Sequence, residues 1–388
     1  MATASTGLSF SFSIPTNIVF GQGSLGAVGT HAKGLGFTRP LIVTDKIMSG
    51  SDGMKQLLAA LAEAGLPAIV WDNIAAEPTD QTLIDGVKRY RAERCDGLIG
   101  FGGGSAMDTA KGVGVLAFTG DDDPAPYQRF GSKTVPGCVP NIAIPTTSGT
   151  GSEVTSVCVL TTLRTGHKLP IRHPSLLPRV ALVDPRLMLS MPPKVTAATG
   201  IDALSHATEC FTQVREHPFA DTLALEATRL IVENLPRAFA NGQDLEARTN
   251  MALAATMAGS AFEVGGLQFH AYAQALGAKY HAAHGVTCGI ALRAGFQQIL
   301  PTAAKKLARM ASAFGVDTRG LGEAQAAERG VAAAIAFINA MGIPKVTEAM
   351  PVTAADIPML TKETLETTAS PIAPEVAQAV WEKILSGK

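Results

Sequence analysis

The sequence of 388 residues predicts an N-terminal α/β domain built on a parallel sheet, followed by an all-helical C-terminal domain. The first half alternates short β-branched runs with helical patterns, which is typical of βαβ units with helices on both faces of a sheet. From about Ser190 onward, Ala, Leu and Met dominate and prolines punctuate long helical patterns. We place the boundary between residues 186 and 194, and therefore assign residues 1–188 and 189–388 to the two domains.

The elements of the first domain are expected in regular alternation. Strands are predicted at residues 40–45 and 67–72, and two further strands, within 96–105 and 141–153, each run into a glycine-rich loop. A helix over 54–64 follows from the spacing of its leucines, and a helix starting after Thr79 or Asp80 follows from a capping residue before an apolar stripe. The loop after residue 101 opens another helix.

Composition narrows the class of protein. Charged residues make up 17%, below the roughly 25% typical of soluble domains, so part of the surface is expected to lie in a subunit interface, with a homodimer as the default. The net charge is −1 and no Lys/Arg run suggests a nucleic-acid partner. No window of about 18 apolar residues predicts a membrane span, and the N-terminus resembles no targeting signal. Five scattered cysteines without a C-x-x-C pair indicate reduced thiols in a cytoplasmic protein.

The first glycine loop is a candidate phosphate site. Glycines directly after a strand let the backbone approach a ligand, and the following helix N-terminus presents free N–H groups to a pyrophosphate. The loop 102–105 is not the G-x-G-x-x-G fingerprint, so an ordinary tight turn stays open as the alternative. The second loop, 146–152, offers hydroxyl and amide donors to the same ligand. Asp45, at the end of a strand, fits either a ribose contact or a helix N-cap.

Four residues of the second domain form a candidate metal site. Asp202 and His206 lie four positions apart on a predicted helix, so their side chains share one face. His270 and His284 can complete the set from two further elements, with Gly277 between them as the expected helix end. One oxygen and three nitrogens suit iron(II) or zinc. A single buried histidine is more often a hydrogen-bonded core residue, and only the combination favours a metal.

The chain resembles the iron-dependent (group III) alcohol dehydrogenase family. The resemblance extends over essentially the whole chain and depends on four motifs in combination. These are GGGSAMDTAK (102–111), PTTSGTGSEVT (145–155), MPP followed by ATGIDALSHATE (191–209), and H-x13-H-G (270–285).

The resemblance implies a dinucleotide-binding N-terminal domain and a metal-binding helical domain, with NAD(P) and a divalent ion meeting in the cleft between them. The implied metal ligands are Asp202, His206, His270 and His284. The implied cofactor residues are the pyrophosphate loop Gly102, Gly103, Gly104, Ser105 with Asp108, the nucleotide-lining Thr146, Thr147, Thr155 and Lys168, and Asp45, whose charge would favour NAD over NADP.

Several positions near the implied centre depart from the family pattern. The pattern is altered at Glu263 to Gly266, Gln274, Ala283, Cys288 and Arg293. These changes leave the ligand set complete but put the substrate in doubt, and four residues are candidates for shaping its pocket: Gln274, His281, Cys288 and Arg293. His281 is also a candidate proton relay, although a solvent-facing histidine at a helix end is the more frequent case.

The resemblance implies an alcohol dehydrogenase or aldehyde reductase. A metal-bound alkoxide would transfer hydride to nicotinamide C4, and in reverse the ion would polarise an aldehyde. Iron(II) is the expected ion, with zinc as the alternative. The same dehydroquinate-synthase-like fold leaves other functions open: a dehydroquinate-synthase-like enzyme, a glycerol-dehydrogenase- or maleylacetate-reductase-like oxidoreductase, and a non-catalytic nucleotide or metal sensor.

Overall fold

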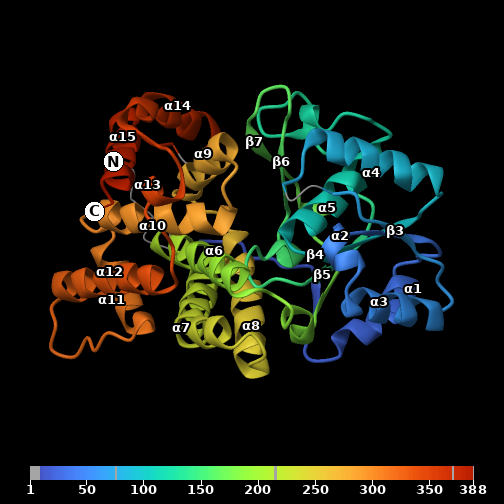
Figure 1. The fold of residues 1–388 in the computed structure, drawn as a ribbon, viewed down its shortest axis with the longest axis horizontal. Coiled ribbons are helices and arrows are strands. Elements are labelled where there is room, and N and C mark those ends of the chain that lie inside the picture. The colour runs from blue at the N-terminus through green and yellow to red at the C-terminus, as the bar shows by residue number, and fades with distance from the viewer. Residues whose placement is uncertain (1–8, 75–76, 214–215, 369–370, 388) are drawn as a thin grey trace.

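The computed structural model describes residues 9–74, 77–213, 216–368 and 371–387. Its N-terminal part is a six-stranded sheet in which every paired strand runs parallel, as predicted. In spatial order the strands are β1 (Asn17–Phe20), β8 (Val180–Val183), β5 (Asn141–Pro145), β4 (Gly97–Gly102), β2 (Pro40–Val43) and β3 (Ile69–Trp71). Figure 1 shows this sheet with its helices at the right of the molecule and the helical part at the left.

Helices cover both faces of the sheet because its strands are apolar on both sides. Alternate residues of β2 point to opposite faces, so Ile42 joins one core while Leu41 and Val43 join the other. The helices α1 (Val28–Gly34) and α3 (Asp52–Glu63) pack on the Ile42 face. The helices α4 (Asp80–Ala92) and α5 (Gly104–Thr119) pack on the other. Thr79 caps α4 by accepting a hydrogen bond from Thr82 N (3.1 Å), which confirms the first of the two predicted caps.

Smaller elements complete the N-terminal part. The helix α2 (Lys46–Ser49) follows β2 directly, and β6 (Val157–Thr161) with β7 (Lys168–Arg172) forms an antiparallel hairpin. The hairpin packs against α5, so that it forms one wall of the space in front of the glycine loop.

The C-terminal part consists of helices, as predicted. They are α6 (Pro193–Thr212), α7 (Pro218–Ala240), α8 (Leu245–Phe262), α9 (His270–Tyr280), α10 (His284–Ile299), α11 (Ala304–Ala311), α12 (Glu323–Ala340), α13 (Val346–Ala349), α14 (Ile357–Thr367) and α15 (Pro374–Ser386). The helix α6 lies at the centre and packs against α7, α8 and α10 (Figure 1). Among the described residues, no helix combines the length and the apolar character that crossing a membrane requires.

The second glycine loop joins the two parts through direct backbone contact. Gly151, at φ 62°, lies so close to Gly259 of α8 that a Cβ on either residue would come within 2.7 Å of the other's Cα. Next to this contact, the buried Glu153 accepts a hydrogen bond from Thr256 Oγ1 (2.8 Å). The loop therefore connects the sheet to the helical part through direct contacts with α8, a role that the sequence did not predict.

Candidate metal centre and cofactor cleft

The helix α6 holds Asp202 and His206 on one buried face. It begins at Pro193, whose fixed φ suits the first turn of a helix. Asp202 and His206 are only 3% and 5% exposed, and Asp202 Oδ1 lies 3.8 Å from His206 Nε2. The predicted i, i+4 pair therefore faces one point.

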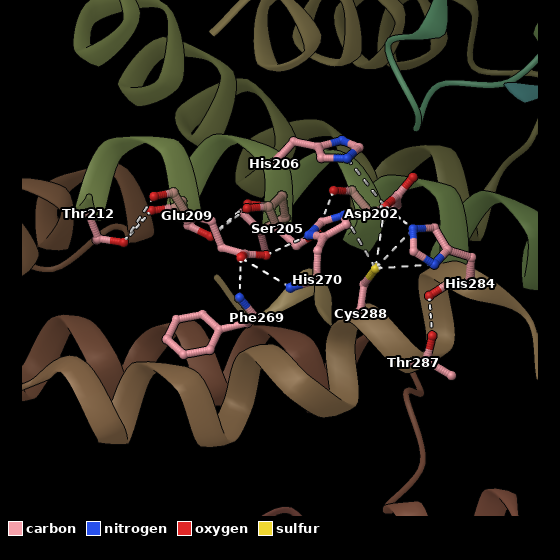
Figure 2. Close-up of polar contacts among 12 residues, drawn as sticks. Asp202, Ser205, His206, Glu209, Thr212, Phe269, His270, His284, Thr287 and Cys288 are labelled. Atoms are coloured by element: carbon pink, nitrogen blue, oxygen red, sulfur yellow. Dashed lines mark hydrogen bonds and ion pairs between the residues drawn. The ribbon is translucent and has the colours of Figure 1, made fainter. Parts of the chain in front are cut away.

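His270 and His284 are the first residues of α9 and α10, and both reach the same carboxylate. Asp202 Oδ1 lies 3.5 Å from His270 Nε2 and 3.6 Å from His284 Nε2 (Figure 2). The structure thus brings together the four residues that the sequence singled out, from three helices. The predicted helix end at Gly277 is wrong, because α9 continues to Tyr280 and ends where His281 adopts a left-handed conformation.

The spacing of these atoms fits a bound divalent cation. In a tetrahedral site with metal bonds of about 2.1 Å, neighbouring ligand atoms stand roughly 3.4 Å apart. The three imidazole nitrogens lie 3.5 to 3.8 Å from Asp202 Oδ1, slightly wider than that value. The donor set of one carboxylate and three imidazoles suits iron or zinc.

Glu209 is a part of the centre that the sequence analysis missed. Its Oε1 accepts a hydrogen bond from His270 Nδ1 (2.7 Å), and its Oε2 accepts one from Phe269 N (2.6 Å) at the start of α9 (Figure 2). This contact leaves Nε2 of His270 free to face Asp202. The available signal was an acid on the same buried helix, two turns after Asp202.

The charges around the centre suit a cation. Burial opposes ionisation of Asp202, but His206, His284 and His270 outweigh it and hold the pKa of this carboxyl well below its usual range. Burial lowers the pKa of His284 to about 3 and also lowers that of His206, so both imidazoles are neutral at pH 7. A buried carboxylate next to these two neutral imidazoles is prepared for a metal ion.

Burial and the neighbouring acidic groups shift the pKa values of His270 and Cys288. Burial alone would lower the pKa of His270, but Cys288, Glu209 and Asp202 raise it well above its ordinary value. Burial raises the pKa of the Cys288 thiol to about 11. Both ring nitrogens of His270 face carboxylates, Nε2 toward Asp202 (3.5 Å) and Nδ1 toward Glu209 (2.7 Å).

Replacing Glu209 with glutamine should weaken metal binding by about 10- to 100-fold, the usual effect of losing the partner that orients a histidine ligand. The measurement is a titration of the metal-free protein with Zn²⁺ against a competing chelator. Glu226→Gln is the matched control, since Glu226 is half-exposed on α7 and pairs with Arg229. An unchanged affinity in Glu209→Gln would remove Glu209 from the centre.

A cleft of about 860 Å³ opens between the glycine loops and these histidines. Its lining on the sheet side includes Gly104, Ser105, Asp108, Thr150, Ser152, Thr155 and Lys168, and on the helical side Asp202, His206, His270, Gln274, His281 and His284. One continuous space therefore has the N-terminus of α5 on one side and the candidate metal ligands on the other.

The glycine loop 102–105 lies at the cleft wall, and its binding of a pyrophosphate stays a prediction. Gly102 ends β4 at φ 150°, Gly103 is the N-cap of α5, and Gly104 with Ser105 forms the first turn at the cleft wall. Backbone N–H groups in that turn lack helical partners and carry a partial positive charge. Asp108 lies one turn further, where its carboxylate accepts hydrogen bonds from Ser152 Oγ (2.6 Å) and Val159 N (2.9 Å). That carboxylate joins α5 to the hairpin.

The remaining cofactor candidates lie around this loop. Thr146 N donates to Gly102 O (2.9 Å), and a side chain on Gly103 would touch Thr147 at 3.5 Å. Thr155 and Lys168 line the cleft, and Lys168 Nζ pairs with Glu77 at 3.0 Å. The roles of these residues toward a nucleotide stay predictions.

Of the two roles predicted for Asp45, the structure shows the helix N-cap. Its Oδ1 accepts hydrogen bonds from Ile47 N (2.8 Å) and Met48 N (2.9 Å), so it is the N-cap of α2. Its Oδ2 points toward the pyrophosphate loop, 3.9 Å from where a Cβ on Gly102 would lie. The cap therefore leaves one carboxylate oxygen available next to the loop.

Lys111 was also missed by the sequence analysis. It is fully buried, and its Nζ donates to Ser152 Oγ (2.7 Å), Val157 O (2.9 Å) and Thr155 Oγ1 (3.3 Å). This cation ties α5 to the second glycine loop and to β6, and so positions hydroxyls of the cleft wall. The sequence offered one indication of this role, namely a lysine among the small residues of an apolar helix.

The four candidate pocket residues separate into two groups. Gln274 and His281 line the cleft, and Cys288 Sγ lies 3.5 Å from Asp202 Oδ1. Arg293 was wrongly predicted, because it lies outside the cleft and donates to Asn339 Oδ1 (2.7 Å) and to the carbonyls of residues 343 and 344. His281 is exposed at the rim, where its part in proton transfer stays a prediction.

A glycine loop at a helix N-terminus and a carboxylate–histidine cluster in one cleft are typical of a metal-dependent, nucleotide-linked oxidoreductase. Residues 15–185 match the model of the iron-containing alcohol dehydrogenases, and residues 196–385 match the model of the C-terminal part of that family. The chain belongs to the iron-containing alcohol dehydrogenase family, as its motifs predicted.

Relatives of known activity span nearly the whole chain. The NAD-dependent methanol dehydrogenase of Bacillus methanolicus is 38% identical over 94% of this chain and 96% of its own. The 1,3-propanediol dehydrogenase of Citrobacter freundii is 38% identical over 92% of each chain. A crystal structure of a 1,3-propanediol oxidoreductase superposes with a TM-score of 0.91 at 34% identity, over 97% of this chain and all of the other.

Proposed function

We propose that this alcohol dehydrogenase interconverts a short primary alcohol and its aldehyde. Its coenzyme is NAD(H) rather than NADP(H), and its metal ion is Fe²⁺, with Zn²⁺ as the alternative. The observation that carries the proposal is the convergence of Asp202, His206, His270 and His284 across one cleft from the N-terminus of α5. The names of the two relatives, which act on methanol and 1,3-propanediol, support a small substrate.

Each part of the cleft has one task in this proposal. The ion would act as a Lewis acid toward the substrate oxygen. Asp202 and the three imidazoles hold it, while Glu209 orients His270. The first turn of α5 binds the pyrophosphate and thereby positions the nicotinamide. His281, exposed at the rim, exchanges the substrate proton with solvent.

The test is an anaerobic screen of NADH oxidation after loading the metal-free protein with Fe²⁺. Short aldehydes, hydroxyaldehydes and acidic aldehydes form the panel, and turnover is expected only in the presence of metal. Tight binding of NADH and metal without turnover of any aldehyde would instead support a sensor. Activity lost in air and restored by Fe²⁺ identifies iron, whereas activity stable in air with zinc retained identifies zinc.

Cofactor preference is expected to depend on the free oxygen of Asp45. Asp45→Asn keeps an oxygen for the α2 cap but removes the charge that would repel a 2′-phosphate. We expect kcat/KM for NADPH relative to NADH to rise about tenfold, or ~1.4 kcal/mol. Asp72→Asn, at the end of β3, is the control and should change nothing. An unchanged ratio in Asp45→Asn would exclude Asp45 from the cofactor site.

The proposed assembly is a homodimer formed through β1. Among the described residues, this edge strand pairs only with β8, and it exposes Ile18 and Phe20. An apolar groove of about 600 Å³ lies beside it, lined in part by Phe12, Phe219 and Leu253. A second copy related by a two-fold axis could pair with the open edge and cover the groove. Light scattering should give twice the chain mass, and a monomer would reject the assembly.

A cytoplasmic location and the division at residues 188 and 189 complete the proposal. All five cysteines are free and buried, in keeping with a reducing compartment. The last strand of the sheet, β8, ends at Val183 and α6 begins at Pro193, so the proposed boundary falls between them.

A further inference from the structure

We propose that Cys288 binds the metal ion directly, as a thiolate, next to Asp202, His270 and His284. The inference depends on the proposed metal centre and adds to it a sulfur ligand. Cys288 is 2% exposed and lies on α10 one turn after His284, on the same helix face. Figure 2 shows its sulfur between the carboxylate and the two imidazoles.

The distances from the sulfur are those expected between ligands of one ion. Cys288 Sγ lies 3.5 Å from Asp202 Oδ1, 3.7 Å from His270 Nε2 and 3.5 Å from His284 Nε2. A tetrahedral ion with a metal–sulfur bond of about 2.3 Å and metal–nitrogen bonds of about 2.1 Å separates sulfur from nitrogen by roughly 3.6 Å. The two sulfur–nitrogen distances in the structure, 3.7 and 3.5 Å, therefore lie on either side of this value.

The same comparison ranks Cys288 above His206 as a neighbour of the other three ligands. In the described part of the chain, Asp202, His270, His284 and Cys288 form a group whose ligand atoms all lie within 4.8 Å of one another. His206 does not belong to that group, although its Nε2 lies 3.8 Å from Asp202 Oδ1. The sulfur is thus at least as well placed for the ion as the histidine that the family resemblance implies.

The alternative role for Cys288 is a thiol that donates a hydrogen bond to Asp202 Oδ1. A bound cation changes this contact, because a coordinating thiol gives up its proton to solvent and binds as a thiolate. A thiolate is a softer ligand than imidazole or carboxylate, so it shifts the preference of the centre toward Zn²⁺ over Fe²⁺. The two roles differ in whether a metal–sulfur bond exists.

Cobalt substitution detects that bond without relying on activity. The metal-free full-length protein is titrated with Co²⁺ while the near-ultraviolet spectrum is recorded. The wild type is expected to bind one Co²⁺ per chain and to gain a sulfur-to-cobalt charge-transfer band. Cys288→Ser should bind Co²⁺ at least about tenfold more weakly and lack the band. Cys138→Ser, at a buried cysteine of the α/β part, should match the wild type.

The outcomes separate this inference from the proposed function. Cobalt bound to the wild type without the band, or a band that persists in Cys288→Ser, overturns the thiolate ligand and leaves the metal centre standing. A wild type that binds no Co²⁺ overturns the centre itself. If Cys288→Ser does not fold, X-ray absorption spectroscopy of the zinc-loaded wild type tests the inference instead. A thiolate ligand requires a sulfur scatterer at about 2.3 Å from the zinc, and its absence overturns the inference.

Discussion

Replacing His270 with alanine is expected to abolish turnover and to lower metal content while NADH still binds with its normal affinity. His270 supplies a nitrogen to the centre and is 5% exposed, and alanine has no side-chain atom that could replace this ligand. Losing the ion's stabilisation of charge costs several kcal/mol, and ~4 kcal/mol corresponds to roughly a thousandfold in kcat. Metal analysis, steady-state kinetics and NADH fluorescence titration measure the three quantities.

The matched control is His217→Ala. His217 is equally buried, but it caps α7 and its Nε2 contacts Ser11 O at 3.2 Å, away from the cleft. This variant should lose some stability and keep a full complement of metal. If His270→Ala retained normal activity and metal, the ligand assignment would be rejected. A parallel loss of NADH binding would show that the variant disturbs the fold.

Gly285→Ala is expected to destabilise the protein by at least about 3 kcal/mol and to weaken metal binding. A Cβ on Gly285 would lie 1.9 Å from Ala198 O, on the backbone of α6, which no side-chain rotation can relieve. The start of α10 must therefore move away from α6, and His284 moves with it, away from Asp202. Denaturant unfolding of the metal-free protein measures the stability, and chelator competition measures the metal affinity.

Gly277→Ala provides the opposite case in the neighbouring helix. Gly277 lies inside α9, where a Cβ would make only an ordinary contact with Ala282 O at 3.7 Å. Alanine costs less backbone entropy than glycine in a helix, so a gain of about 0.5 to 1 kcal/mol is expected. Equal stabilities for the two variants would contradict the close approach of α10 to α6.

The parts of the fold that the sequence predicted correctly depend on local patterns. Strand and helix alternate with characteristic periods, and the cap at Thr79 needs only its own neighbours. The pairing of β1 with β8 joins residues about 160 positions apart, and no local pattern encodes it. The end of α9 was misplaced because glycine was treated as a breaker, whereas the structure accommodates Gly277 within the helix.

In the candidate site, too, contacts within one helix could be predicted from the sequence, whereas hydrogen bonds between helices could not. Helical spacing placed Asp202 and His206 on one face, since four residues advance about 400° around the axis. The same arithmetic brings Cys288 to within about 40° of His284 and turns Arg293, nine residues on, about 180° away. The position of Glu209 on the same helix as Asp202 could be noticed in the sequence, but its pairing with His270 could not, because it joins helices whose contact is set by tertiary packing.

The contact between Gly151 and Gly259 has a consequence for how this protein can evolve. A side chain at either position collides with main chain on the other side, so no second mutation at its partner can compensate for the first. Protein interiors usually accommodate a larger side chain when a neighbouring side chain becomes smaller. That compensation is impossible here, because both residues are glycines and have no side chain. Lineages that keep the two backbones this close must inherit both glycines, and a lineage that loses one must rebuild the junction between sheet and helices.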